Sequence, residues 1–157
     1  MERKLTFSVG EFYHLYNRGV EKRNIFLGKK DFQKWHSEKS SIHYDKMRPF
    51  FHVREVWFCS LGANVGFEQD GGGDRYLRPV LILRKFNNEV LWILPFTKHD
   101  KKGKYYFSIK ISNSKLPSAV ILSQIRLIDA KRLQYKIGDI SEEDFLEVKK
   151  RLRALLE

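Results

Sequence analysis

The sequence has 157 residues, of which 42% are hydrophobic and 14% aromatic, enough for one folded domain and too apolar for a disordered chain. Thirty lysines and arginines against nineteen aspartates and glutamates give a formal net charge of +11, which favours a polyanionic partner such as a nucleic acid. The single cysteine excludes an intramolecular disulfide and a cysteine-rich zinc site. No stretch is apolar and long enough for a signal peptide or a membrane span, so we expect a cytoplasmic protein without membrane contact.

Strand-like sequence is concentrated after residue 50, which predicts an N-terminal extension, residues 1–46, ahead of the main domain, residues 47–157. Within the extension, "EFYHLYNRGVEKRNIFL" (11–27) resembles the opening strand of the repeat-associated single-tyrosine transposases. The metal-binding histidine motif of those enzymes does not follow it. We therefore interpret the segment as a remnant and assign it no catalytic residue.

Three strands are predicted in the first part of the domain. "VREVWFCSL" (53–61) is rich in β-branched and aromatic residues, and its apolar character predicts a buried, unreactive thiol at Cys59. After a loop, residues 62–77, "PVLILRKF" (79–86) and "EVLWILPF" (89–96) flank Asn87-Asn88 and predict a hairpin, because asparagine tolerates the positive φ of tight turns. Both strands are apolar on both faces, so we expect them at the centre of a sheet.

The remaining elements are three strands and a helix. "YYFSIKI" (105–111) alternates apolar and polar residues, as a half-buried strand does. "SAVILSQIRLI" (118–128) and "KRLQYKI" (131–137) follow, and Ser141 caps a helix whose apolar residues, Phe145, Val148, Leu152 and Leu155, share one face. Six short strands and a closing helix predict an α+β, mainly β fold, a small strongly curved antiparallel barrel.

Motifs of other enzyme classes are absent from the sequence. There is no nucleophile-elbow, phosphate-loop or zinc-protease motif. The five histidines are scattered, and none is paired with another at metal-ligand spacing. We therefore predict no metal site and no cofactor. Taken alone, Gly71 to Gly73 predict only a mobile surface loop.

Three segments in one order carry a resemblance. "VREVWFCSLGANVGFEQDGGGDRYLRPVLILRKF", "ILPFT" and "ILSQIRLIDAKRL" resemble, from about residue 48 to 157, the MazF/PemK family of type II toxin endoribonucleases. The resemblance implies a Src-homology-3-like barrel with helices outside, and residues 31–51 are similar to the helical lead-in of the family. It also implies a homodimer that cleaves single-stranded RNA, such as mRNA, without a metal and is bound by a cognate antitoxin protein.

The resemblance assigns catalytic roles to Arg78, in the Arg-Pro pair, and to Thr97. RNA carries its own nucleophile, the 2'-hydroxyl, so such an enzyme needs a proton acceptor and neutralisation of the phosphorane rather than a metal ion. A guanidinium can hold two phosphate oxygens at once, and the threonine hydroxyl can donate to the phosphate. Two candidates for the general base remain open, the Glu68 carboxylate and a guanidinium that would accept a proton against its usual chemistry. By analogy with the family, the products are a 2',3'-cyclic phosphate and a 5'-hydroxyl.

RNA contacts are expected around these residues. The loop that contains Phe67 and Gln69 lines the RNA channel in the resembling family, and its glycines keep it movable. Four lysines beside Thr97 can follow the phosphate chain without reading sequence; they are Lys98, Lys101, Lys102 and Lys104. Three aromatic side chains, Phe67, Tyr76 and Tyr105, can stack on unpaired bases. Gln124 and Arg126 either contact RNA or only connect the sheet.

Two alternative functions remain open from the sequence. The charge and the aromatic residues also fit a barrel that binds nucleic acid without cutting it, which would show salt-sensitive binding and no cleavage. The segment 11–27 also fits a transposase-derived DNA-binding protein.

Overall fold

The structure, a computed structural model, describes residues 30–98, 103–114 and 118–157. The transposase-like segment 11–27, together with Lys101 and Lys102, lies outside the described residues. Residues Phe32–Glu157 form one unit by their internal contacts, whereas the predicted domain starts at residue 47. The boundary at that residue stays a prediction.

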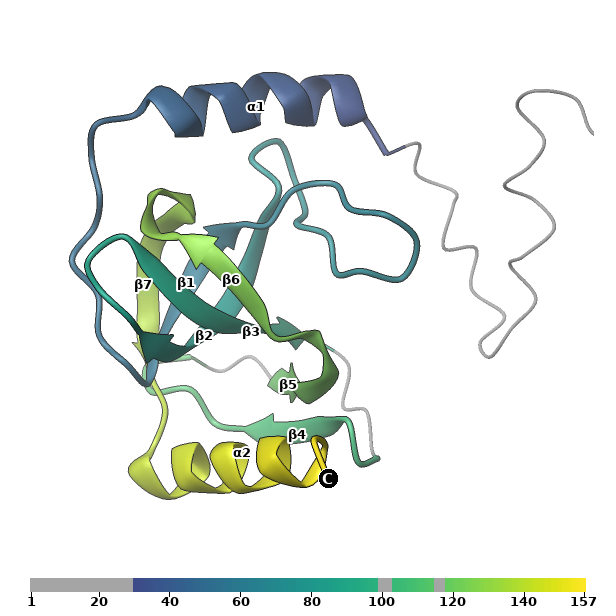
Figure 1. Cartoon of the computed structure of the whole chain (residues 1–157), viewed down its shortest axis with the longest axis vertical. Helices are drawn as coiled ribbons and strands as arrows, with labels where there is room; N and C mark the ends of the chain where they lie inside the picture. Colours follow the sequence, from purple (N-terminus) through teal and green to yellow (C-terminus); the bar gives the residue numbers. More distant parts are fainter. Residues whose placement is uncertain (1–29, 99–102, 115–117) are drawn as a thin grey trace, which may run out of the picture. The chain divides into compact units, whose positions relative to one another are not determined.

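The described chain is mainly an antiparallel sheet with one helix before it and one after it (Figure 1). The strands follow the order β4-β5-β3-β2-β1-β7, and β6 pairs with β3. In chain order, the elements are α1 (Phe32–Tyr44), β1 (Glu55–Ser60), β2 (Leu77–Lys85), β3 (Val90–Thr97), β4 (Tyr106–Ile109), β5 (Ser118–Ile121), the 3-10 turn η1 (Leu122–Gln124), β6 (Arg126–Asp129), the 3-10 turn η2 (Ala130–Arg132), β7 (Leu133–Asp139) and α2 (Glu142–Ala154). No helix in this part of the chain is long and apolar enough to cross a membrane.

The strongly curved barrel that the sequence predicts is not confirmed, because the end strands β4 and β7 are not paired in the part of the sheet that the structure describes. They approach each other at one point. Just after β4, the Ser112 amide donates to the Asp139 carbonyl at 2.9 Å, and the Asp139 amide donates to Ser112 Oγ at 2.8 Å. Gly138 permits this approach, since a Cβ there would lie 2.1 Å from the Ser112 carbonyl oxygen. The sheet is therefore open, with its two ends in contact.

The predicted strand 118–128 is wrong as a single strand and forms two, β5 and β6, which makes seven strands rather than six. Both pair with β3, but Phe96 pairs with Val120 and Ile93 pairs with Arg126. The three-residue step from Phe96 to Ile93 on β3 therefore corresponds to a six-residue step from Val120 to Arg126. The three additional residues form η1. This insertion turns the η1 side chains out of the regular ladder.

The hairpin of β2 and β3 is confirmed, but its turn differs from the prediction. Neither Asn87 nor Asn88 has a positive φ. Instead, the Asn87 side-chain oxygen accepts from the amides of Glu89 and Val90, both at 2.8 Å, and the Phe86 amide donates to the Val90 carbonyl at 3.2 Å. A longer loop held by an asparagine side chain thus replaces the tight two-residue turn.

The sheet is buried on both faces at its centre, as the apolar sequences of β2 and β3 predicted. Alternate residues point to opposite faces, and they belong to separate apolar clusters. One cluster includes Leu81 and Leu94 and is covered by α2 through Phe145 and Val148; the other includes Ile82 with Phe51 and Trp57. The N-cap of α2 is also confirmed, since the Asp144 amide donates to Ser141 Oγ at 3.0 Å.

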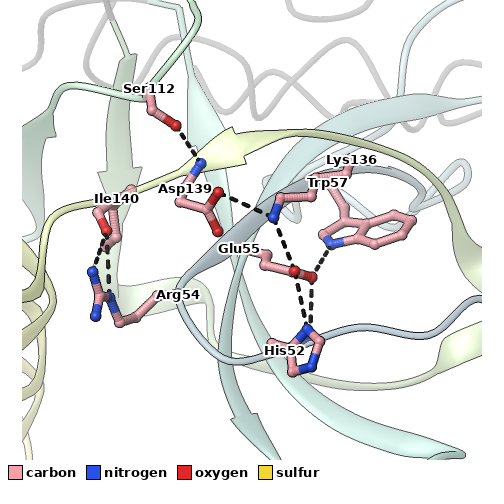
Figure 2. Close-up of polar contacts among 8 residues, drawn as sticks. All are labelled: His52, Arg54, Glu55, Trp57, Ser112, Lys136, Asp139 and Ile140. Atoms are coloured by element: carbon pink, nitrogen blue, oxygen red, sulfur yellow. Dashed lines mark hydrogen bonds and ion pairs between the residues drawn. The ribbon is translucent and has the colours of Figure 1, made fainter.

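A buried carboxylate joins β1 to β7 (Figure 2). Glu55 accepts from the His52 amide at 2.9 Å and from the Trp57 indole at 2.8 Å, and it pairs with Lys136 at 3.0 Å. Lys136 also pairs with Asp139 at 3.0 Å. Burial alone would raise the pKa of Glu55, but these hydrogen bonds outweigh it and lower the pKa to about 2. The ionised carboxylate therefore stabilises the start of β1.

Candidate active site

The loop between β1 and β2 is folded onto itself by backbone contacts. The Leu61 amide donates to the Tyr76 carbonyl at 3.0 Å and the Gly71 amide to the Gly62 carbonyl at 2.9 Å. Only glycine fits at position 71, because a Cβ would lie 1.5 Å from the Tyr76 carbonyl oxygen. Inside the loop, the Asp70 carboxylate accepts from the Asn64 amide at 2.6 Å. The glycine run therefore permits a specific close turn.

Arg78 lies at the start of β2, where its guanidinium connects the loop to β3. Nε donates to the Asp70 carbonyl, and Nη1 donates to the Phe96 carbonyl at 2.9 Å. The side chain is half-buried, and this burial lowers its pKa; the negative charge of Asp70 opposes the shift, and the positive charge of Arg126 adds to it. The guanidinium is thus fixed in direction by two backbone carbonyls.

Thr97 ends β3 and is buried, with 9% of its surface exposed. Its backbone pairs with Ala119 in β5. Because Arg78 binds the carbonyl of Phe96, the residue immediately before Thr97, the structure brings the two predicted catalytic residues next to each other at the ends of β2 and β3.

A groove of about 520 Å³ is lined by four of the predicted site residues, Phe67, Glu68, Gln124 and Arg126, whereas Arg78 and Thr97 are not among its lining residues. The Gln124 side chain clamps the loop: its oxygen accepts from the Gln69 amide at 2.8 Å, and its nitrogen donates to the Phe67 carbonyl at 3.1 Å. Arg126 pairs with Glu68 at 3.3 Å. The sequence left two roles open for Gln124 and Arg126, a contact with RNA or a connection within the sheet. The structure shows a further role, because both side chains hold the loop.

The other predicted contacts are more dispersed. Lys98 is exposed just after β3, and the Lys104 ammonium lies 4.9 Å from the centre of the half-exposed Tyr105 ring. Phe67 is 67% exposed, so its ring is accessible to a base. The expectation that Tyr76 stacks on bases is wrong, because Tyr76 is buried and its ring lies 5.2 Å from that of Trp35.

Sequence reasoning missed three residues of this region. Ser123 and Ile125 line the groove, and Asp70 provides the carbonyl that holds Arg78. Ser123 and Ile125 stand directly beside Gln124 in the sequence. They were missed because the sequence did not indicate the 3-10 turn η1, which interrupts the strand at this point. For Asp70, the contact is made by the backbone, which no residue pattern indicates.

The titratable groups near the sheet do not form a metal site among the described residues, where no three His, Cys, Asp or Glu side chains come together. Cys59 is fully buried in β1, as predicted. Burial raises the pKa of its thiol to about 12, although the positive charges of Arg132 and Arg126 oppose the shift. The thiol therefore stays protonated and is a structural side chain.

Comparison with known protein families gives one match. The sequence profile of the family described as "PemK-like, MazF-like toxin of type II toxin-antitoxin system" matches residues 52–156, which is more than half of the chain. The match includes Arg78, Thr97 and the whole groove and leaves out α1. No curated protein is similar to the sequence at a significant level.

Solved structures share the fold at low sequence identity. An endoribonuclease in complex with its cognate antitoxin from Mycobacterial species is 14% identical with a TM-score of 0.54, over 68% of this chain and 95% of that one. MazF from Deinococcus radiodurans is 17% identical with a TM-score of 0.53, over 71% and 98%. The Mycobacterium tuberculosis toxin MazF-mt6 is 16% identical with a TM-score of 0.52, over 66% and 96%. At these identities the likeness establishes a MazF-like fold.

Proposed function

The chain belongs to the PemK-like, MazF-like toxin family of type II toxin-antitoxin systems, and from this premise we propose that it is an endoribonuclease that cuts single-stranded RNA without a metal ion. The observation that carries the proposal is the guanidinium of Arg78, held by the Phe96 carbonyl beside Thr97. A guanidinium stays charged at physiological pH and can bind two phosphate oxygens in one plane. Arg78 is thus a cation that two backbone carbonyls hold at the start of β2.

In the proposed reaction, the 2'-oxygen of the RNA attacks the adjacent phosphorus. The new bond forms between the 2'-oxygen and phosphorus, the bond from phosphorus to the 5'-oxygen breaks, and the leaving 5'-oxygen takes up a proton from water. Arg78 neutralises the charge that develops on the phosphorane, and the Thr97 hydroxyl donates to it. The products are a 2',3'-cyclic phosphate and a 5'-hydroxyl.

Glu68 is the base that we propose for the 2'-hydroxyl proton. Its carboxylate lines the groove and is paired with Arg126 at 3.3 Å. An RNA phosphate that binds Arg126 competes for this ion pair and frees the carboxylate for proton transfer. In this proposal, substrate binding breaks the ion pair between the Glu68 carboxylate and Arg126.

The proposal is tested with purified full-length protein and end-labelled single-stranded RNA in excess chelator. We expect the wild type to cut and Arg78→Ala to lose about 10²- to 10³-fold in rate, as when a preorganised donor is removed from a transition state. Arg78→Lys keeps the charge but not the fork, and we expect it to recover only part of the rate. Intact RNA with the wild type, or equal cutting by Arg78→Ala, would contradict the proposal. Binding without cutting would indicate the non-catalytic barrel instead.

We propose that a cognate antitoxin binds an apolar groove of about 470 Å³ between α2 and η1. The lining of this groove includes Arg84, Lys149 and Arg153 and no acidic residue, which suits a segment with apolar anchors and acidic side chains. Ser123 and Ile125 line both this groove and the one at Arg126, so a segment bound in the first groove can extend to the second. An acidic peptide with leucine anchors should inhibit wild-type cleavage but not that of a Lys149→Glu/Arg153→Glu variant.

The homodimer implied by the family resemblance remains a proposal. Two large apolar side chains are exposed on β3 and β6, Trp92 and Leu127, and their backbones pair with each other. Exposed apolar surface of this kind is typical of protein contacts. Sedimentation velocity at several concentrations should give the mass of two copies, and a single-copy mass throughout would contradict the proposal.

A further inference from the structure

Helix α1 lies outside the residues that match the toxin family, yet it packs against the loop between β1 and β2 (Figure 1). Its contacts are made at the two ends of that loop, residues 62–63 and 74–76. A helix that lies before the residues matched by the family is therefore attached to the loop that contains Phe67 and Glu68.

Trp35 makes the central contact. The indole is 8% exposed and packs with Ala63 and Tyr76. It lies so close to the Gly62 backbone that a Cβ there would be 2.3 Å from the indole ring. Gly62 begins the loop and Tyr76 nearly ends it, so one side chain spans the two points where the chain leaves and re-enters the sheet.

Charged contacts hold α1 over the same loop. The Lys34 ammonium binds the Asp74 carboxylate at 2.5 Å, and Glu38 lies 3.9 Å from Arg75. At the far end of the helix, Lys131 donates to the His43 carbonyl at 2.7 Å. The helix is thus fixed to η2 while its first turns engage the loop.

A cation also lies near the indole ring. The guanidinium of Arg132 is 5.4 Å from the centre of the Trp35 ring. It is itself fixed by a hydrogen bond to the Ser60 carbonyl at 3.0 Å. Because Ser60 ends β1, this cation–π contact ties the position of Trp35 to the sheet from which the loop departs.

The loop is therefore held from two sides. On the site side, Gln124 clamps the Phe67 and Gln69 backbone, and Arg78 binds the Asp70 carbonyl. On the other side, α1 holds Gly62, Asp74 and Tyr76. A shift of the loop toward or away from α1 moves Phe67, which lines the groove, while Arg78 stays held by the Phe96 carbonyl of β3.

We propose that α1 is part of the active-site scaffold, and that Trp35 and Lys34 are positioning residues that set how the loop receives RNA. The inference rests on the proposed ribonuclease function, because it assigns the substrate-binding geometry of that site. It also predicts that the residues before the family's common domain influence RNA affinity rather than the chemical step.

The experiment uses full-length variants and two independent readouts. Hydrogen exchange, followed by mass spectrometry, reports on peptides that cover residues 62–77, and steady-state cleavage of a short single-stranded RNA gives KM and kcat. Trp35→Ala removes the ring and Trp35→Phe keeps an aromatic side chain. Lys34→Glu places like charges together, and the swap Lys34→Glu/Asp74→Lys restores the attraction. Phe32→Ala is the matched control, because Phe32 is 53% exposed on the same helix.

We expect Lys34→Glu and Trp35→Ala to speed exchange in the loop selectively and to raise KM about tenfold, with kcat changed by less than about threefold. Trp35→Phe and the charge swap should recover most of both effects, and Phe32→Ala should cause neither. The inference is wrong if loop exchange or KM stays at the wild-type value in both variants. It is also wrong if exchange rises equally in β2 and β3, which indicates general destabilisation.

The two readouts separate the inference from the proposed function. If the wild type cuts no RNA, the ribonuclease proposal fails whatever the exchange data show. If the wild type cuts and only the exchange or KM response is missing, the ribonuclease proposal stands and the role of α1 falls.

Discussion

Replacing Gln124 with alanine removes both hydrogen bonds that close the loop over the groove. The bonds join the side-chain amide to the Gln69 amide at 2.8 Å and to the Phe67 carbonyl at 3.1 Å. Each such bond contributes about 0.5 to 1.5 kcal/mol net, so the closed loop loses about 1 to 3 kcal/mol. The ratio of open to closed loop should therefore rise about 5- to 150-fold, since about 1.4 kcal/mol corresponds to a factor of ten.

The assay is hydrogen exchange at the Gln69 amide, because this N–H donates directly to the Gln124 side chain. Its exchange rate should rise by the factor just given, while amides in the buried strands keep their wild-type rates. Ser123→Ala is the control. Ser123 lines the same groove and makes no hydrogen bond to the loop within the described part of the chain.

An unchanged Gln69 exchange rate in Gln124→Ala would refute the reasoning, because it would mean that the loop is closed without the clamp. An equal acceleration in Ser123→Ala would also refute it, since that result would assign the effect to the groove in general. Gln124→Glu adds a finer comparison. The carboxylate can still accept from the Gln69 amide but cannot donate to the Phe67 carbonyl, so we expect at least part of the loss.

Further predictions concern the framework that carries the site. The pKa of Glu55 is lowered from 4.5 to about 2, so its ionised form stabilises the fold above pH 4.5 by at most about 3 kcal/mol. Urea unfolding at pH 7 should show that Glu55→Gln has lost this contribution. The wild type should lose the same contribution as the pH falls from 4.5 toward 2. Gly62→Ala should lower the melting temperature, since Gly62 has a φ of +94° and a Cβ there meets Trp35, whereas Gly66→Ala meets open space and should cost less despite its φ of +56°. The Cys59 thiol should react with a disulfide reagent at pH 8 only after unfolding, because it is buried with a pKa of about 12; rapid reaction of the folded protein would contradict its burial.

Much of the candidate site could be predicted because the residues stand in recognisable short segments. Phe67, Glu68, Gln124 and Arg126 were each expected at the site, and the structure brings them into one groove. Their chemical roles stay predictions. Tyr76 was misjudged because an aromatic residue in a polar loop gives no indication of a helix more than thirty residues earlier that covers it.

The sequence by itself determined the elements whose signals are local. The alternation in β4, the continuous apolar runs of β2 and β3 and the Ser141 cap of α2 depend on residues within a few positions of one another. These signals suffice because steric and capping preferences act over one turn or one pleat.

Only the tertiary structure decided how these elements meet. The split of one predicted strand at η1, the open sheet and the contacts of the loop all depend on pairs far apart in the chain, such as Gln69 with Gln124 across 55 residues and Lys34 with Asp74 across 40. Such partners are selected by the packing of the whole sheet, because a side chain binds whatever the fold brings within reach. The position of Arg78 beside Thr97 is of this kind, since it follows from the pairing of two strands and not from either sequence alone.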